Sequence, residues 1–396
     1  MLDLNVIKNF SLDKKSWKKV KLGDVVFEPK ESVKDPIAEG IEHVVGLEHI
    51  NSEDIHLRRS ANIKESTTFT KKFKKGDVLF GRRRAYLKKA AKANFEGICS
   101  GDITVMRAKE ELLLPELLPF LINNDKFFDF AITHSAGGLS PRVKFKDLAN
   151  YELSLPSTKK QLELVVLFNQ KDNYLQHQNS LLEKLQTLKN ATLKSIYNHS
   201  STPKNPSDVS SEIGYIPEGW AIEEQGSVVK FINGRAYKKT EWEEEGTPVI
   251  RLQNLTGTGE KYYYSKLDLP DKNYCDSGDL LYMWSATFGA IIWEGSRAIF
   301  HYHIWKIECD ESKILKKFMF YNLEEITRRM MKQASGSTMP HITKEGMEKL
   351  KIALPTISKQ VEFVSKLDKI MENINNTKSN ISLFKKLSNN MIEQVF

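Results

Sequence analysis

Basic side chains crowd the stretch from residue 71 to residue 92. It carries ten lysines and arginines against a single acidic residue, Asp77, and the aromatic residues Phe80 and Tyr86 stand among them. Lysines suit contacts with phosphates, and an arginine can also donate two hydrogen bonds to O6 and N7 of a guanine. The sequence therefore predicts a surface for a polyanion, although a solvated charged hairpin would have the same composition. The candidate contacts are Lys72, Lys75, Arg82, Arg83, Arg84, Lys88 and Lys89.

Three consecutive arginines in this stretch follow hydrophobic residues that read as a strand. Successive side chains of a strand point to opposite faces. At most two of the three should then reach one partner surface, and we favour Arg82 and Arg84.

Two serine- and glycine-rich segments, 135–142 and 335–341, stand at matched places in the two halves of the chain. Glycine lets a backbone approach a duplex closely, and the polar side chains offer hydrogen bonds. The same composition also suits an ordinary surface turn. The candidate residues are Ser135, Gly138, Arg142, Ser337, Thr338 and His341.

The second half is less basic where the first half is most basic. Segments 251–254 and 284–287 are polar and aromatic instead, and glutamine or asparagine side chains suit the edge of adenine. Different half-sites would require such divergence, and so would unequal packing. The run Tyr262-Tyr263-Tyr264 fits packing better than binding. The candidate contacts are Arg251, Gln253, Asn254, Ser285 and Thr287.

An internal repeat of the chain must position the candidate contact residues of both halves. A phrase of the form Leu-Pro-x-x-x-x-Gln begins at Leu155 and again at Leu354, and the pair Gly76-Asp77 has a counterpart in Gly278-Asp279. Repetition of this kind indicates one structural unit written twice. Short strand-like segments at 44–47, 77–80 and 103–106, with one helix expected at about 115–130, indicate an α+β class.

Each copy of the phrase opens a long helical run. Thr158 and Gln161 fit a capping box, and the following run of roughly 40 residues lacks glycine and proline, which predicts a helix of about 60 Å. Apolar residues recur in heptads, which favours pairing of the two helices, although an amphipathic helix lying on its own domain would also show a stripe. Because the first helix leads to the second domain and the second helix leaves it, a pair would be antiparallel. The seam residues are Leu164, Phe168, Leu175, Leu182, Leu185, Ile196, Phe363, Leu367, Ile370, Ile374, Ile381 and Phe384.

These signals divide the chain into five segments. We expect a first globular domain at 1–156, a first long helix at 157–199, a linker at 200–210, a second globular domain at 211–355 and a second long helix at 356–396. The two domains would be related by a pseudo-two-fold axis and joined by an antiparallel coiled coil.

Composition sets the class of protein. The chain has 396 residues and a net charge of +8. Its three scattered cysteines form no CxxC pair, which favours the reducing cytoplasm and argues against a fold held by disulfides. We find no signal peptide and no apolar run long enough to cross a membrane. A positive balance suits a nucleic acid without requiring one.

Patterns for catalysis are weak. No phosphate-binding loop of the GxxxxGK[ST] type and no Asn-Pro-Pro-aromatic methyltransferase tetrad is present. Asp271, Glu311 and Lys313 match a loose nuclease pattern at an unusually long spacing. His301 and His303, with Cys309 nearby, would need further ligands to hold a metal, and packed histidines explain them better.

The layout resembles the specificity subunit of type I restriction-modification systems. The resemblance rests on the duplicated Leu-Pro-x-x-x-x-Gln phrase, the entry Ser-Glu-Ile-Gly-x-Ile-Pro-Glu-Gly-Trp at 211–220, and Gly-Asp-Val-Leu-Phe-Gly-Arg at 76–82. It implies two target-recognition domains, each reading half of a split site in double-stranded DNA. It also implies helices that hold two methyltransferase subunits, with restriction and motor subunits in the full complex. S-adenosylmethionine, ATP and Mg²⁺ would then belong to the partners, and this chain would not be an enzyme. A stand-alone DNA-binding regulator and a Mg²⁺-dependent nuclease are the alternatives.

Overall fold

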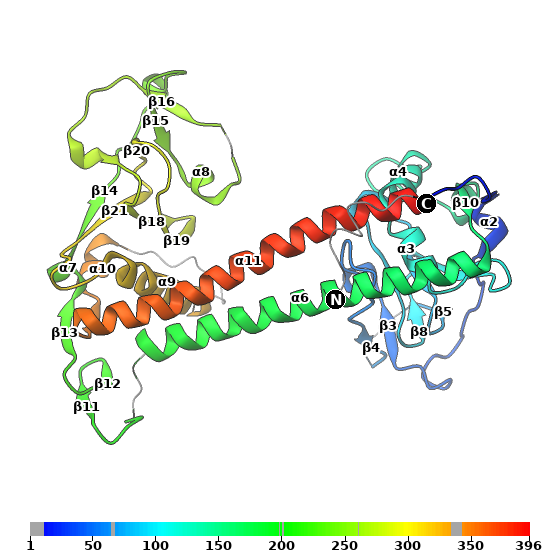
Figure 1. Cartoon of the computed structure of the whole chain (residues 1–396), viewed down its shortest axis with the longest axis horizontal. Coiled ribbons are helices and arrows are strands. Elements are labelled where there is room, and N and C mark those ends of the chain that lie inside the picture. Colours follow the sequence, from blue (N-terminus) through cyan, green and yellow to red (C-terminus); the bar gives the residue numbers. More distant parts are fainter. Residues whose placement is uncertain (1–11, 65–67, 198, 200–201, 260, 334–342) are drawn as a thin grey trace. The chain divides into compact units, whose positions relative to one another are not determined.

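A computed structural model describes residues 12–64, 68–197, 199, 202–259, 261–333 and 343–396 (Figure 1). The chain forms two compact units. Unit 1 takes the chain up to Leu181 together with Thr377–Phe396, and unit 2 is Leu182–Asn376. Each unit therefore contains one globular domain and part of both long helices, α6 (Thr158–Tyr197) and α11 (Ile357–Val395).

Unit 1 contains two four-stranded sheets with the orders β2-β9-β6-β7 and β4-β3-β8-β5, and a separate pair β1-β10. Strands β3 and β8 run parallel, and their other neighbours are antiparallel. The strands are β1 (Lys18–Lys21), β2 (Val26–Phe27), β3 (His43–Val45), β4 (Ala61–Asn62), β5 (Lys71–Phe73), β6 (Val78–Gly81), β7 (Ala90–Lys92), β8 (Gly97–Cys99), β9 (Ile103–Ala108) and β10 (Glu152–Leu155). The shorter helices are α2 (Leu22–Val25), η1 (Leu47–His49), η2 (Ala85–Leu87), α3 (Leu118–Ile122), α4 (Asp125–Thr133) and α5 (Phe145–Leu148).

Unit 2 repeats this arrangement strand for strand. Its sheets have the orders β14-β21-β18-β19 and β16-β15-β20-β17, its separate pair is β13-β22, and β15 and β20 are again parallel. One further hairpin, β11-β12, precedes the repeat. The strands are β11 (Asp208–Ser211), β12 (Gly214–Pro217), β13 (Ala221–Glu224), β14 (Val229–Asn233), β15 (Thr247–Ile250), β16 (Tyr263–Ser265), β17 (Tyr274–Cys275), β18 (Leu280–Ser285), β19 (Thr287–Ile292), β20 (Ala298–Phe300), β21 (Ile304–Cys309) and β22 (Lys351–Leu354). The shorter helices are α7 (Gln225–Val228), η3 (Lys239–Glu241), α8 (Leu252–Thr256), η4 (Asp271–Asn273), α9 (Lys316–Gln333) and α10 (Lys344–Lys349).

Strand β6 shows how the sheets build the core of unit 1. Val78 and Phe80 face one apolar cluster, shared with α3, α4 and the long helices, while Leu79 faces another that lies between the two sheets. Both faces are thus buried, which explains the uninterrupted hydrophobic run. In unit 2, β18 divides Leu280 and Leu281 between two clusters in the same way.

The repeated glutamine fastens each long helix to its own domain. The Gln161 side chain accepts a hydrogen bond from the Leu114 amide at 2.9 Å and donates to the carbonyls of Leu112, at 2.8 Å, and Pro156, at 3.1 Å. Gln161 is buried. The predicted capping box is therefore wrong, because the glutamine amide bonds a distant loop rather than the first turn of its helix.

Gln360 repeats the arrangement in unit 2. It accepts from the Leu315 amide at 2.9 Å and donates to the carbonyls of Lys313, at 2.8 Å, and Pro355, at 3.0 Å. The Leu-Pro-x-x-x-x-Gln phrase thus ends a strand, turns the chain and locks the helix that follows.

The long helices run antiparallel. In unit 1, the first half of α6 meets the second half of α11, with ring centroids of Phe168 and Phe396 6.3 Å apart and those of Tyr174 and Phe384 4.4 Å apart. In unit 2, residues late in α6 and early in α11, including Ile196 and Leu367, share one cluster. Coiled-coil geometry stays a prediction. Of the predicted seam, Leu164, Phe168, Ile196, Leu367, Ile370, Ile374, Ile381 and Phe384 are buried, and Leu175, Leu182, Leu185 and Phe363 are partly buried.

Two sequence-based boundaries differ from the structure. The helix expected at 115–130 is two helices, α3 and α4, because Asn124 caps the second by accepting a hydrogen bond from the Phe127 amide. The linker expected at 200–210 is shorter, since β11 begins at Asp208.

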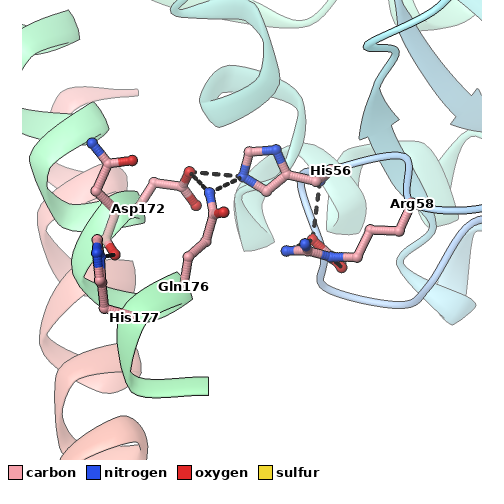
Figure 2. Close-up of polar contacts among 7 residues, drawn as sticks. His56, Arg58, Asp172, Gln176 and His177 are labelled. Atoms are coloured by element: carbon pink, nitrogen blue, oxygen red, sulfur yellow. Dashed lines mark hydrogen bonds and ion pairs between the residues drawn. The ribbon is translucent and has the colours of Figure 1, made fainter. Parts of the chain in front are cut away.

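A second polar contact ties α6 to the globular part of unit 1. His56 lies in the loop before β4, and its Nε2 is 2.7 Å from a carboxylate oxygen of Asp172 and 2.9 Å from the Gln176 amide (Figure 2). Gln176 also donates to Asp172 at 2.7 Å. In unit 2 a polar contact at a different place ties α11 to the globular part, because Lys317 and Tyr321 of α9 both bond Asp368 of α11, at 2.6 and 2.7 Å.

The glutamine lock should be measurable as stability. We expect Gln161→Ala or Gln360→Ala to lower the free energy of unfolding of its own unit by about 2–4 kcal/mol, because buried backbone groups lose their partners. Hydrogen exchange with mass spectrometry would locate the effect. Gln186→Ala is the matched control, since Gln186 is exposed on α6. Equal effects of Gln161→Ala and Gln186→Ala would contradict the lock.

Candidate nucleic-acid interface

The structure brings two predicted segments of unit 1 together. Arg83 and Arg142 form a β-bridge, the Arg84 amide donates to the Pro141 carbonyl at 2.8 Å, and the Val143 amide donates to the Arg82 carbonyl at 3.0 Å. The arginine run and the serine- and glycine-rich loop are thus one surface.

The arginines do not lie on a strand as expected. Strand β6 ends at Gly81, and Arg84 has a left-handed backbone with φ of 54°. The alternation that favoured Arg82 and Arg84 therefore does not apply. Arg84 is exposed, whereas the Nε atoms of Arg82 and Arg83 are buried and have no hydrogen-bond partner among the described residues.

Asp102, at the turn between β8 and β9, binds two of the arginines. One oxygen is 2.7 Å from Nε of Arg142, and the other is 3.3 Å from Nη1 of Arg83. The hydrogen bond from Arg142 is the main cause that lowers the pKa of Asp102, so the carboxyl is ionised. Ser140 completes the group, because its hydroxyl accepts from Arg83 at 3.1 Å and from Arg84 at 3.4 Å. The sequence reasoning missed Asp102 and Ser140, and the Gly101-Asp102 turn was the available signal for the former.

Much of the basic stretch is neutralised within unit 1. The ion pairs are Lys71 with Glu28, Lys72 with Glu39, Lys74 with Glu31, and Lys88 with Asp125. Lys89 donates to the Leu47 carbonyl at 2.7 Å. Within the described ranges, no carboxylate pairs with Lys75, Arg82 or Arg84. The charge count along the sequence therefore overstates the free positive charge.

The loop that carries Arg142 projects from the domain. Leu139 is 96% exposed, and an added Cβ on Gly138 would meet nothing within 4 Å. Ser135 instead caps α4, because its hydroxyl donates to the Ala131 carbonyl at 2.8 Å. The accessible part of this loop is therefore its tip rather than Ser135.

Unit 2 places a different set of side chains at the same position. The Trp284 amide donates to the His303 carbonyl at 3.2 Å, as the Arg82 amide donates to the Asp102 carbonyl at 3.0 Å. Ala286, with φ of 59°, corresponds to Arg84. The predicted residues Ser285 and Thr287 lie here, Ser285 partly buried and Thr287 exposed.

Arg251 lies on an aromatic platform beside this position. Its guanidinium carbon is 4.3 Å from the ring centroid of Tyr263 and 6.0 Å from that of Trp242. Gln253 is exposed. Asn254 already serves the backbone, since it accepts from the Arg251 amide at 2.9 Å and donates to two carbonyls, each at 3.2 Å.

Two histidines complete the surface of unit 2. His301 and His303 have ring centroids 5.5 Å apart; His301 forms a β-bridge with Arg235, and His303 lies in the turn that follows. Burial lowers the pKa of both rings, so both are neutral near pH 7. Ser337, Thr338 and His341 lie outside the described residues.

The features that suggested catalysis have other partners. Asp271 of the loose nuclease pattern is 2.5 Å from Arg297, which also binds Asp276 at 2.8 Å. Over the part of the chain that the structure describes, no three histidine, cysteine, aspartate or glutamate side chains are grouped to hold a metal. Among the same described residues, no helix is both long and apolar enough to span a membrane.

A family model for the type I restriction modification DNA specificity domain matches residues 14–187 and again residues 217–383. The chain belongs to this family. The two matches to the specificity domain cover the two copies of the repeated arrangement. Family membership thus agrees with the resemblance that the sequence motifs carried.

Curated relatives carry the same description. The MjaVIII specificity subunit of Methanocaldococcus jannaschii is 25% identical over 322 residues, covering 75% of this chain and 73% of the relative. The EcoBI specificity subunit of Escherichia coli is 26% identical over 168 residues, 42% of this chain and 35% of the relative. The match thus spans about a third of the E. coli specificity subunit.

Solved structures share the fold. A chain in a structure of a type I restriction-modification system has a TM-score of 0.60 at 21% identity, covering 96% of this chain and 97% of that one. The specificity subunit from M. genitalium has a TM-score of 0.58 at 12% identity, covering 98% of each chain.

His301 makes the stability of this specificity protein depend on pH. Burial is the main cause that lowers its pKa to about 4. Unfolded histidine has a pKa of about 6.5, so the unfolded state gains the proton first as pH falls. The contribution of neutral His301 to the free energy of unfolding is therefore complete above about pH 6.5 and is lost as the pH falls toward 4. The loss is on the order of 1–2 kcal/mol after solvent screening. In denaturant unfolding, the free energy of unfolding should fall less between about pH 6.5 and pH 4 in His301→Gln than in the wild-type protein. Equal decreases would contradict the assignment of this pH dependence to His301.

Proposed function

We propose that this chain is the DNA-specificity subunit of a type I restriction-modification complex and reads a bipartite site in double-stranded DNA. The observation that carries the proposal is a repeated scaffold with unlike surfaces. The same strand order recurs in both units, while residues 82–84 are three arginines in unit 1 and their counterparts in unit 2 are Trp284, Ser285 and Ala286, which carry no charge. Two identical sites would not call for this difference, whereas two different half-sites would.

The surface of unit 1 suits both phosphates and bases. Lys75 and Arg84 are exposed cations without an ion-pair partner among the described residues, which suits phosphate contacts. Arg142 also lies on the loop whose tip projects, and its side chain is 43% exposed, as a base-reading arginine requires. In unit 2, Arg251 and Gln253 offer a guanidinium and an exposed amide, the groups that read guanine and adenine edges.

The long helices suit protein partners. Leu162 and Val166 on α6, and Val361 on α11, are each more than half exposed although apolar. Such side chains favour association. We place two methyltransferase subunits on these helices, with restriction and motor subunits in the full complex. S-adenosylmethionine, ATP and Mg²⁺ would belong to those partners, and this chain would act in the cytoplasm without catalysis of its own.

The alternatives predict different behaviour. A stand-alone regulator of the same fold would bind DNA without co-purifying methyltransferase subunits. A nuclease would cut DNA with Mg²⁺ in the absence of any other subunit, and Asp271→Ala would abolish the cleavage. We expect the purified chain to cut no DNA and to transfer no methyl group from S-adenosylmethionine.

Selection from a random duplex library tests the function itself. The full chain should enrich two short sequence elements at a fixed separation, because each unit contributes one element. Arg82→Ala with Arg84→Ala should weaken binding to the whole site and flatten the salt dependence, because phosphate contacts release counterions. Lys184→Ala is a control for lost charge, because Lys184 is an exposed lysine of α6 and belongs to neither candidate surface. Enrichment of no sequence by the wild-type chain would sink the proposal.

A further inference from the structure

We propose that Asp102 is a positioning residue that presents Arg142 to a guanine in the half-site of unit 1. The inference rests on the proposed function and deepens it, because it names one base-reading side chain and the group that orients it. Arg142 and Asp102 are 40 residues apart in sequence, so their contact becomes visible only in the fold.

Arg142 is held along one edge of its guanidinium group. Nε donates to one oxygen of Asp102 at 2.7 Å, and Nη2 lies 3.5 Å from the other oxygen. Both hydrogens of Nη1 and the second hydrogen of Nη2 stay available, and one hydrogen from each of these nitrogens forms the end-on fork that fits O6 and N7 of guanine. The Arg142 side chain is 43% exposed, so this fork is accessible.

Arg83 has a supporting part instead. Its Nη1 is 3.3 Å from Asp102 and its Nη2 is 3.1 Å from the Ser140 hydroxyl, so both ends of its fork are engaged. The bridge between Arg83 and Arg142 fixes the backbone of the loop at the same place. Arg83 therefore holds the loop and the carboxylate, and leaves Arg142 to face the partner.

A carboxylate behind the arginine has a definite physical effect. A free arginine loses much side-chain freedom when it forms two hydrogen bonds to a base, and a fixed orientation reduces that loss. Asp102 is itself fixed, because its amide donates to the Ser100 hydroxyl at 3.2 Å and it is 22% exposed. Its charge also offsets one arginine, which favours base discrimination over uniform attraction to phosphates.

The test compares base preferences rather than overall affinity. The site that the wild-type full chain selects would be varied one base pair at a time, and binding of Asp102→Asn and Arg142→Lys measured by fluorescence anisotropy over a range of salt. Both variants should lose about tenfold or more of the preference for G·C at one and the same base pair. Arg142→Lys keeps its charge, so the salt slope should change little.

Asp54→Asn is the matched control. Asp54 binds Nε of Arg58 at 2.7 Å, and its side chain is also 22% exposed. The Asp54→Asn variant therefore loses an equivalent ion pair in the same unit. It should leave the base preferences unchanged. An unchanged preference in Asp102→Asn, a change at a base pair that Arg142→Lys does not affect, or an equal change in Asp54→Asn would overturn the assignment while the proposed function stands. If the wild-type chain selects no sequence, the proposed function fails first.

Discussion

A buried glutamine amide joins strand, loop and long helix in each unit. Gln161 and Gln360 each satisfy one backbone amide and two carbonyls in places that water does not reach. Leaving such groups unpaired is costly, so the helix can start in only one direction from its domain. The antiparallel contacts of α6 and α11 within each unit depend on that starting direction.

The sequence predicted the repeat, the α+β class and the two long helices, because each leaves a local pattern. It did not predict the role of the repeated glutamine, since two of the three partners of Gln161 lie 47 and 49 residues earlier in the chain. A side chain with donor and acceptor groups fits a capping box equally well on local evidence. Only the position of Leu112 and Leu114 in the fold decides between the two interpretations.

The binding surface was predictable by segment but not by residue. The arginine run and the glycine-rich loop were both singled out, and the fold brings them together through Arg83 and Arg142. Counting charges along the chain failed for the lysines, because carboxylates such as Glu39 and Asp125 come from distant segments. The role of Asn254 was also hidden, since an amide that caps a turn looks the same in sequence as one that reads a base.

Two attachment points on α6 have a mechanical consequence. Gln161 and Asp172 are eleven residues apart, which is about three turns and therefore nearly the same side of the helix. A helix attached to its domain at one point can still rotate about that point. Two attachments along one side of the helix couple its rotation to that of the domain. Because His56 belongs to a loop of this domain, replacing that loop would remove one of the two polar attachments, and a rotation of the domain would then reach α6 through Gln161 and the apolar contacts alone.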